Sequence, residues 1–311
     1  MSDPAALTGY LAAEGYLDQL RTELEFAGAA VAAVHGRLIL AEGPPLAAAW
    51  AQNAWFDVQR VAIGSIADAA AKLRAMQRNW ALYDFHLHRR AALIEAKLPV
   101  VRPKPLSFPQ VPPTAPLGSW TLLDHETVLA AQRCASPFRH GEARFVEDRE
   151  APPNRAYLKL WEALTLIGRH PAPGALCLDL GASPGGWTWA LQRLGARVIA
   201  VDKAPLDPGI AALPGVETRQ ASAFSLDPRS FGPQGAGPVD WLFSDVVCYP
   251  ARLLTFVRRW LDAGTCRNFV CTLKFQRATD HETARAFAAI PGARLMHLHH
   301  NKHELTWTRL E

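Results

Sequence analysis

A glycine-rich turn between two apolar runs is the stretch of this sequence best suited to hold a ligand. The run 176–180 is typical of a buried strand, and the turn 181–186 follows it directly. A helix is predicted over 187–194 and a second buried strand over 197–201, which ends on Asp202. A βαβ unit of this size binds its ligand on the amides at the helix N-terminus, with an acid in reach of ribose hydroxyls. The pattern therefore predicts a nucleotide-like ligand.

The glycine spacing indicates which nucleotide. Gly181 is followed by Ala182 and Ser183, so the second glycine of the dinucleotide fingerprint G-x-G-x-x-G is missing. Asp-Leu-Gly-Ala-Ser-Pro-Gly-Gly-Trp at 179–187 resembles motif I of S-adenosylmethionine-dependent methyltransferases. Its Pro-Gly-Gly-Trp ending is similar to that of the FtsJ-type RNA ribose methyltransferases. The alternative is a plain strand–turn–helix of another α/β protein.

The resemblance implies a binding site for S-adenosylmethionine. Residues 183–186 would hold the methionine end, and Asp202 would accept hydrogen bonds from the ribose hydroxyls. Family members often carry an acid after the third strand that binds adenine, and Ser222 stands at that place here. The expected cofactor-binding residues are Gly181, Ala182, Ser183, Pro184, Gly185, Gly186, Trp187, Asp202, Ser222 and Asp245.

Three charged residues lie at or near the predicted carboxyl ends of strands, where catalytic side chains are expected, and a fourth lies on a helix. Asp245 and Lys274 each end an apolar run, and Glu304 opens the last one. In α/β sheets the site lies at the carboxyl ends of the strands. Lys159 lies on the helix before the first strand of this sheet. A lysine at the end of a buried run costs desolvation unless it is paired, and the two acids would supply the pairing.

Lys159, Asp245, Lys274 and Glu304 resemble, position by position, the Lys-Asp-Lys-Glu tetrad of the FtsJ-type enzymes. The resemblance implies methyl transfer to a ribose 2′-hydroxyl of RNA, with Lys274 as the general base and no metal ion. Burial and the second cation, Lys159, would both disfavour the ammonium form of a lysine base. The acids would orient the amine. The alternative is that these four residues are ordinary surface charges without a common function.

Two further functions stay open at this point. The missing adenine acid and the short N-terminal region fit an RNA-binding or ribosome-assembly factor that has the fold but little or no turnover. A methyltransferase for a protein or a small molecule is the other. His297, His299, His300 and His303 could suggest a metal, but their spacing matches no known site, and we expect a hairpin instead.

From residue 155 onward, predicted strands and helices alternate. This alternation indicates an α/β fold with a mostly parallel sheet covered on both faces. Two strands over 294–299 and 304–310, joined by a short turn, would end it antiparallel. We therefore expect a Rossmann-like methyltransferase domain over 153–311.

The region before it is divided into two parts. Residues 1–76 are expected to form a small α/β module, with helices over 12–26, 47–55 and from Ser65 to Met76, and strands over 29–34, 37–41 and 57–63. Residues 77–152 hold a basic helical segment and a proline-rich extended linker at 99–116.

Segments of both halves look most like the RlmM group. They are 153–160, the motif at 179–187, the C-terminal strand pair and, more loosely, 7–76. That group methylates a cytidine ribose in large-subunit ribosomal RNA. It carries a ferredoxin-like part and a THUMP domain, of which 77–152 would be a remnant. The resemblance implies ribosomal RNA as the partner and RNA binding as a role for 1–76.

The amino-acid composition is typical of a globular protein and not of a membrane protein. The 311 residues are 49% hydrophobic and 20% charged, with no apolar run long enough to span a membrane and no signal peptide. Five cysteines without C-x-x-C spacing suggest a reduced, cytoplasmic protein.

The net charge of +4 is too small to argue for nucleic acid by itself. Residues 71–104 do mix eight basic residues with Trp80, Tyr83 and Phe85. This stretch is either an RNA-binding surface or a solvated helix whose aromatics pack in the core.

Overall fold

Three β-sheets organise the computed structural model, which describes residues 6–232 and 237–311. The chain divides into two units that we describe separately. The first unit holds the residues up to Leu106 and Pro112–Arg144, and the second holds Ser107–Val111 and Phe145–Glu311. The short exchange of segments arises because Phe108, from the proline-rich stretch, stacks on Trp161 of the second unit with ring centroids 5.0 Å apart. The structure thus differs from the extended, unpacked linker expected there.

The second unit is built on a seven-stranded sheet with the order β12-β11-β10-β13-β14-β16-β15. Neighbours from β12 to β14 are parallel, and β16 is antiparallel to both β14 and β15. The expected mostly parallel sheet with an antiparallel last strand is therefore confirmed. Its strands are β10 (Leu176–Leu180), β11 (Arg197–Asp202), β12 (Val216–Gln220), β13 (Val239–Ser244), β14 (Cys266–Lys274), β15 (Ala293–Met296) and β16 (Glu304–Arg309).

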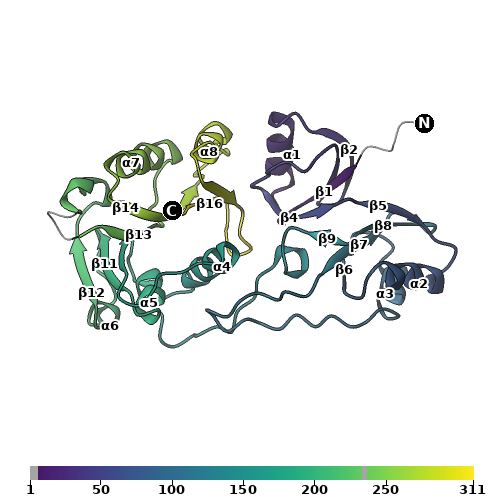
Figure 1. The fold of residues 1–311 in the computed structure, drawn as a ribbon, viewed down its shortest axis with the longest axis horizontal. Helices are drawn as coiled ribbons and strands as arrows, with labels where there is room; N and C mark the ends of the chain where they lie inside the picture. The colour runs from purple at the N-terminus through teal and green to yellow at the C-terminus, as the bar shows by residue number, and fades with distance from the viewer. Residues whose placement is uncertain (1–5, 233–236) are drawn as a thin grey trace. The chain divides into compact units, whose positions relative to one another are not determined.

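Helices cover both faces of this sheet, with α4 and α5 on one side and α7 and α8 on the other (Figure 1). Parallel strands buried on both faces are largely apolar, and β10 is buried at every position with Asp179 as its one charged residue. The helices of this unit are α4 (Tyr157–Ile167), α5 (Gly186–Arg193), α6 (Pro208–Ala211), α7 (Pro250–Ala263) and α8 (His281–Ala288).

Helix α7 shows how the sequence sets these elements. Leu253, Phe256, Val257 and Trp260 are buried at helical spacing, so one stripe of the helix faces the sheet. Pro250 occupies the first turn, and the helix ends at Gly264, whose φ of 64° is the left-handed conformation that glycine adopts at little cost.

The first unit begins with a five-stranded antiparallel sheet of order β2-β3-β1-β4-β9. Its first four strands have the ferredoxin-like order, but no helix joins β3 to β4. Its elements are β1 (Leu7–Ala12), α1 (Leu17–Phe26), β2 (Ala30–His35), β3 (Leu38–Glu42), β4 (Ala51–Phe56) and β9 (Arg133–Cys134).

Two sequence predictions fail in this sheet. The helix predicted over 47–55 is wrong, because Asn53 and Trp55 are buried at alternate positions and β4 pairs with both β1 and β9. The helix predicted from residue 12 begins only at Leu17, because the residues before it form the central strand β1. In both places pairing with distant strands decided the structure.

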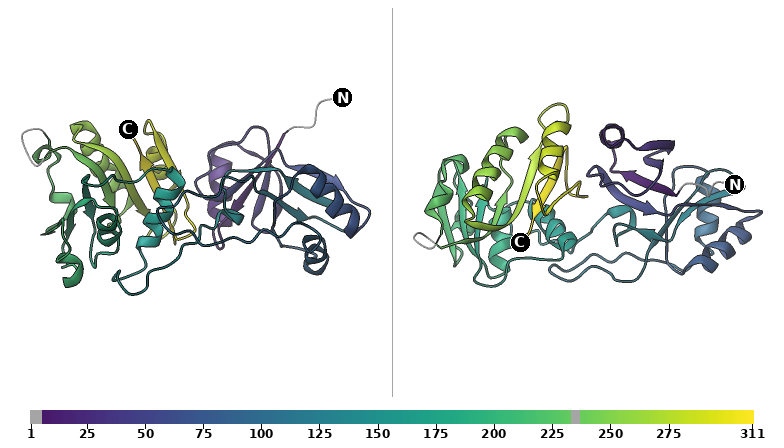
Figure 2. Two further views of the ribbon diagram at one scale, coloured as in Figure 1. Left: turned by 60° about the horizontal axis from the view of Figure 1, so that its bottom comes forward. Right: turned by 45° about the horizontal axis from the view of Figure 1, so that its top comes forward.

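A second sheet, of order β5-β8-β7-β6, completes the first unit. Helices α2 and α3 lie side by side on one face of it (Figures 1 and 2). In β8, Val128 and Ala130 pack toward these helices, whereas Leu129 and Ala131 pack with Leu11, Trp55 and other residues of the first sheet. The elements are β5 (Gln59–Ala62), α2 (Ile66–Met76), β6 (Trp80–Leu82), α3 (His88–Glu95), β7 (Gly118–Leu122) and β8 (Thr127–Ala131).

This sheet joins residues from both sides of the expected division at residue 76. Strand β5 precedes that residue and pairs with β8, which follows it. The expected cap is present: the Ser65 side chain accepts a hydrogen bond from the Asp68 amide at the start of α2. Trp80 and Tyr83 are buried, so these two aromatics of the basic stretch belong to the core.

Two bulk properties complete the description. Among the described helices, none has the length and apolar character that crossing a lipid bilayer requires. All five cysteines are free thiols, and four of them are buried.

Candidate active site

The four charged residues expected to act together lie at one end of the seven-stranded sheet. Because β16 runs antiparallel to β14, its first residue, Glu304, pairs with Lys274, the last residue of β14. Asp245 directly follows β13, and Lys159 extends from α4. Lys159 Nζ lies 2.9 Å from Asp245 Oδ1 and 2.7 Å from Glu304 Oε1. Lys274 Nζ lies 3.0 Å from Asp245 Oδ2.

Asp245 is the centre of this arrangement, since each of its carboxylate oxygens faces a different lysine. Lys274 also donates to the backbone carbonyl of Asp245 at 2.6 Å. Burial alone would raise the pKa of Asp245, but the two nearby ammonium groups outweigh it and lower the pKa. Burial acts to lower the pKa of Lys159, and the carboxylates of Asp245 and Glu304 outweigh it and raise the pKa. The group is a nearly buried alternation of opposite charges.

Glu304 is held in place through a buried acid that the sequence analysis did not single out. Glu162, one helical turn beyond Lys159, is fully buried. Its two oxygens accept the amides of His299 and His300 at 2.7 and 3.0 Å, and Oε2 lies 2.6 Å from His300 Nδ1. The loop before β16 is therefore tied to α4 at two points, the Glu162 contacts and the Lys159–Glu304 pair. A charged residue one turn from Lys159 in an otherwise apolar helix was the available signal.

The histidines near this loop point to separate partners. His297 Nε2 lies 3.0 Å from the carbonyl of Lys302, and His303 Nε2 lies 2.8 Å from Thr279 Oγ1. Burial lowers the pKa of His297 to about 4. Within residues 6–232 and 237–311, no three His, Cys, Asp or Glu side chains gather in a way that could hold a metal ion.

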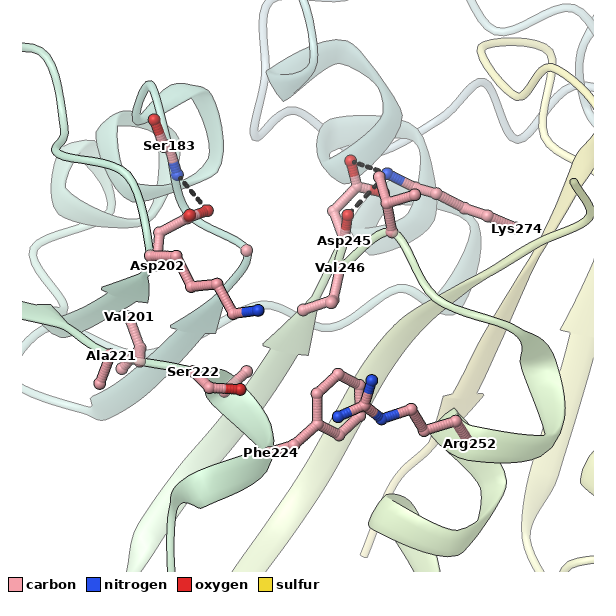
Figure 3. A pocket seen from close by; sticks show the side chains of 14 residues that line it. Ser183, Val201, Asp202, Ala221, Ser222, Phe224, Asp245, Val246, Arg252 and Lys274 are labelled. Atoms are coloured by element: carbon pink, nitrogen blue, oxygen red, sulfur yellow. Dashed lines mark hydrogen bonds and ion pairs between the residues drawn. The ribbon is translucent and has the colours of Figure 1, made fainter.

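A pocket of about 370 Å³ opens beside these charges. Figure 3 shows Asp202 on one side of it and Asp245 with Lys274 on another. Of the expected cofactor-binding residues, Gly181, Ser183, Asp202, Ser222 and Asp245 line this pocket.

The remaining expected contacts, Ala182, Pro184, Gly185, Gly186 and Trp187, are not part of the pocket lining. A Cβ on Gly185 would lie 2.7 Å from Ile210 Cγ2, and one on Gly186 would lie 2.2 Å from Asn154 Oδ1. Trp187 is buried and donates its indole N–H to the carbonyl of Ala156 at 2.9 Å. These glycines are needed for close packing inside the protein, which the sequence pattern alone does not distinguish from closeness to a ligand.

Asp202 folds back onto the glycine turn. Its Oδ2 accepts the amide of Ser183 at 3.0 Å, and its Oδ1 accepts the amide of Ala204 at 2.9 Å. A carboxylate oxygen can accept a second hydrogen bond, so both oxygens keep acceptor capacity toward the pocket.

The pocket also has a wall that the sequence analysis missed. Phe224 and Arg252 line it, and the guanidinium carbon of Arg252 lies 4.0 Å from the centroid of the Phe224 ring (Figure 3). Phe224 in turn packs edge-on against Phe256, with centroids 5.4 Å apart. No motif marks this pair, because the two residues come together only when the loop after β12 meets α7.

Asp179, the first residue of the glycine motif, is buried beneath the turn. Thr188 donates its hydroxyl to Asp179 Oδ2 at 2.6 Å, and Oδ1 has no hydrogen-bond partner among the described residues. Burial, reinforced by the negative charges of Asp245 and Asp202, raises the pKa of Asp179 to about 7, and the Thr188 hydrogen bond opposes the rise.

Comparison with known proteins finds a family that part of this unit resembles. Residues 152–283 match the FtsJ-like methyltransferase family. The match lies wholly within the second unit. Its matched segment runs from just before α4 to the start of α8, and so includes three of the four clustered charges, Lys159, Asp245 and Lys274.

Several curated relatives of this chain bear the same name. The chain is 39% identical over 162 residues to ribosomal RNA large subunit methyltransferase M of Halorhodospira halophila, covering 50% of this chain and 46% of that protein. It is 36% identical over 191 residues to the protein of the same name from Alkalilimnicola ehrlichii, covering 57% and 51%. The chain thus spans about half the length of the curated relatives it matches.

A solved structure similar to this chain is 1,6-didemethyltoxoflavin-N1-methyltransferase of Burkholderia thailandensis. The TM-score is 0.36 at 19% sequence identity, covering 51% of this chain and 80% of that one.

Proposed function

We propose that this protein transfers a methyl group from S-adenosylmethionine to a ribose 2′-hydroxyl of RNA, and that the RNA is ribosomal. The observation that supports the proposal most is the meeting of two lysines and two acids beside a pocket that also reaches Asp202. The names of the relatives support the ribosomal substrate.

The pocket residues suit the proposed cofactor. Asp202 and Ser222, at the ends of β11 and β12, offer polar atoms of the kind that bind a ribose and a purine edge. Val201, Ala221 and Val246 give the same pocket an apolar lining for a flat ring. When bound, S-adenosylmethionine supplies a methyl group on a positively charged sulfur.

Lys274 is the proposed general base. Lys274 lines the pocket, and in its neutral amine form Nζ can accept the proton of a hydroxyl placed beside it. Asp245 fixes that nitrogen through its carboxylate and its backbone carbonyl. Lys159 takes up the other oxygen of Asp245 and is itself balanced by Glu304, so Asp245 does not act as a counter-ion for Lys274 alone. Most of the rate enhancement would come from holding the reacting groups in line.

The test is methyl transfer from labelled cofactor to protein-free ribosomal RNA by the parent and by Lys274→Ala. We expect the variant to lose about 10²–10⁴-fold in rate, the range for general acid–base catalysis. Arg258→Ala, at an exposed position of α7 outside the pocket lining, is the control and should transfer methyl at the parent rate. Equal rates for Lys274→Ala and the parent, both loaded with cofactor, would refute the role of Lys274.

A second candidate is an RNA-binding factor that has the fold without turnover. Ser222 in place of the adenine-binding acid is the observation that favours it. Titration calorimetry with S-adenosylmethionine separates the candidates, because a protein that does not bind the cofactor cannot carry out the proposed reaction.

A further inference from the structure

Two large apolar side chains are exposed in the segment that follows Asp245 and borders the pocket. Among the described residues of the second unit, the large apolar side chains that are clearly exposed are those of Val111, Val146, Val247 and Tyr249. Val247 is 73% exposed and Tyr249 is 62% exposed. These two lie in one short segment that begins directly after Asp245. Exposed apolar side chains that gather beside a pocket mark a surface that binds something.

This exposure does not come from a loose loop. Cys248, between the two exposed residues, is buried. Val246 packs against the glycine turn so closely that a Cβ on Gly181 would lie 2.9 Å from its backbone nitrogen. The carbonyl of Tyr249 accepts the amide of Arg252 at 3.0 Å, at the start of α7. The backbone therefore holds the two side chains outward before any partner arrives, which lowers the entropic cost of binding.

The positively charged side chain of Arg252 lies close to this segment. Arg252 lies over the ring of Phe224, with its guanidinium carbon 4.0 Å from the ring centroid, and both line the pocket (Figure 3). Val247 and Lys274 line the same pocket. Val247 and Arg252 thus line the pocket that contains the proposed base, and the exposed Tyr249 lies between them in the chain.

We propose that Val247, Tyr249 and Arg252 form the surface that receives the nucleotide carrying the target ribose. The Tyr249 ring stacks on an unpaired base of the RNA, Val247 contacts its edge, and Arg252 pairs with a phosphate. Proteins read unpaired RNA by stacking bases on aromatic rings and neutralising the backbone with arginine. A base inside a duplex has no free face, so the proposal commits to single-stranded or splayed-out RNA. This assignment rests on the proposed function and names the surface that would bind its RNA substrate.

The test compares Tyr249→Ala and Tyr249→Phe with the parent. The readout is the dissociation constant for protein-free large-subunit ribosomal RNA, measured alongside that for S-adenosylmethionine. Stacking on one base is worth about 1–3 kcal/mol, so Tyr249→Ala should weaken RNA binding about 5- to 150-fold. Tyr249→Phe keeps the ring and should stay within about twofold of the parent, and cofactor binding should change in neither variant. Val146→Ala, at an exposed apolar position outside the pocket lining, is the matched control.

Arg252→Gln tests the phosphate contact. Loss of one phosphate contact should lower the slope of log affinity against log salt by about one.

RNA binding by Tyr249→Ala that equals the parent's would overturn the proposal, as would equal weakening in Val146→Ala. Methyl transfer is measured separately. A parent that binds RNA through Tyr249 but transfers no methyl would refute the proposed function and leave this surface supported.

Discussion

Asp179 shows how a single residue of a motif can be set by its surroundings. It opens the glycine motif, yet it lies beneath the turn, with Thr188 donating to one oxygen and no described residue donating to the other. Its pKa of about 7 reflects burial first and then the carboxylates of Asp245 and Asp202. Near neutral pH this carboxyl group is therefore divided between its neutral and charged forms.

That pKa predicts a specific pH dependence of stability. The folded-state pKa is raised above the unfolded value of about 3.9, so the stability that Asp179 contributes is complete below that value. It is lost as the pH rises through 7. In Asp179→Asn this loss is absent, while the Thr188 hydroxyl keeps an acceptor.

Denaturant unfolding of the parent and of Asp179→Asn at pH 5 and pH 8 measures the effect. From pH 5 to pH 8 the parent should lose on the order of 2 kcal/mol more stability than the variant. The difference between the two proteins is compared, because other groups titrate in both. An identical pH dependence in parent and variant would show that the Asp179 carboxyl does not titrate in this range.

At the scale of elements, the site depends on one helix and one loop. Helix α4 carries Lys159 and Glu162 one turn apart: Glu162 contacts the loop that leads into β16, and Lys159 contacts Glu304, the first residue of that strand. Without the Glu162 contacts, the backbone amides of His299 and His300 would lose their acceptor. We infer that Glu162 positions Glu304 through this loop.

The variant Glu162→Gln removes the charge and turns an N–H₂ group toward amides that need an acceptor. We predict faster hydrogen exchange at the amides of His299 and His300, and lower stability by about 1–3 kcal/mol, because a buried amide N–H loses its acceptor. Glu282→Gln, at an exposed position of α8, is the control and should leave both unchanged. Unaltered exchange in Glu162→Gln would mean that the loop is held by other contacts.

At the scale of the whole molecule, the chain has separate cores in two units. In the first unit, one core cluster lies between α2, α3 and the second sheet, and another lies between that unit's two sheets. The second unit is built on its own seven-stranded sheet and contains the pocket. A ligand that binds only the folded form of one unit should stabilise that unit.

Differential scanning calorimetry with S-adenosylhomocysteine, the product of methyl donation, tests this. We predict two transitions, of which only one moves to higher temperature with the ligand. At a ligand concentration of about 100 Kd the stabilisation should be about 2.7 kcal/mol. A single transition that moves as a whole would show that the two units unfold together.

The accuracy of the sequence predictions differs between the two halves for a physical reason. In the second unit, buried elements such as strand β10 and helix α7 carry apolar residues at the spacing of their own secondary structure. Both were therefore predicted from the sequence nearly to the residue. In the first unit, residues 51–56 have a mixed pattern without a clear period. Their pairing with β1 and β9, far away in the sequence, made them a strand.

The sequence by itself determined the alternating elements, the glycine turn and the four charged residues, because periodicity and motif spacing are local properties. The tertiary structure decided that Lys274 and Glu304 face each other, since only the antiparallel register of β14 and β16 sets that pairing. It also decided that Gly185 serves packing, and that Arg252 lies on Phe224. Contacts of this kind join segments that no local pattern connects, so they become known only when the chain is folded.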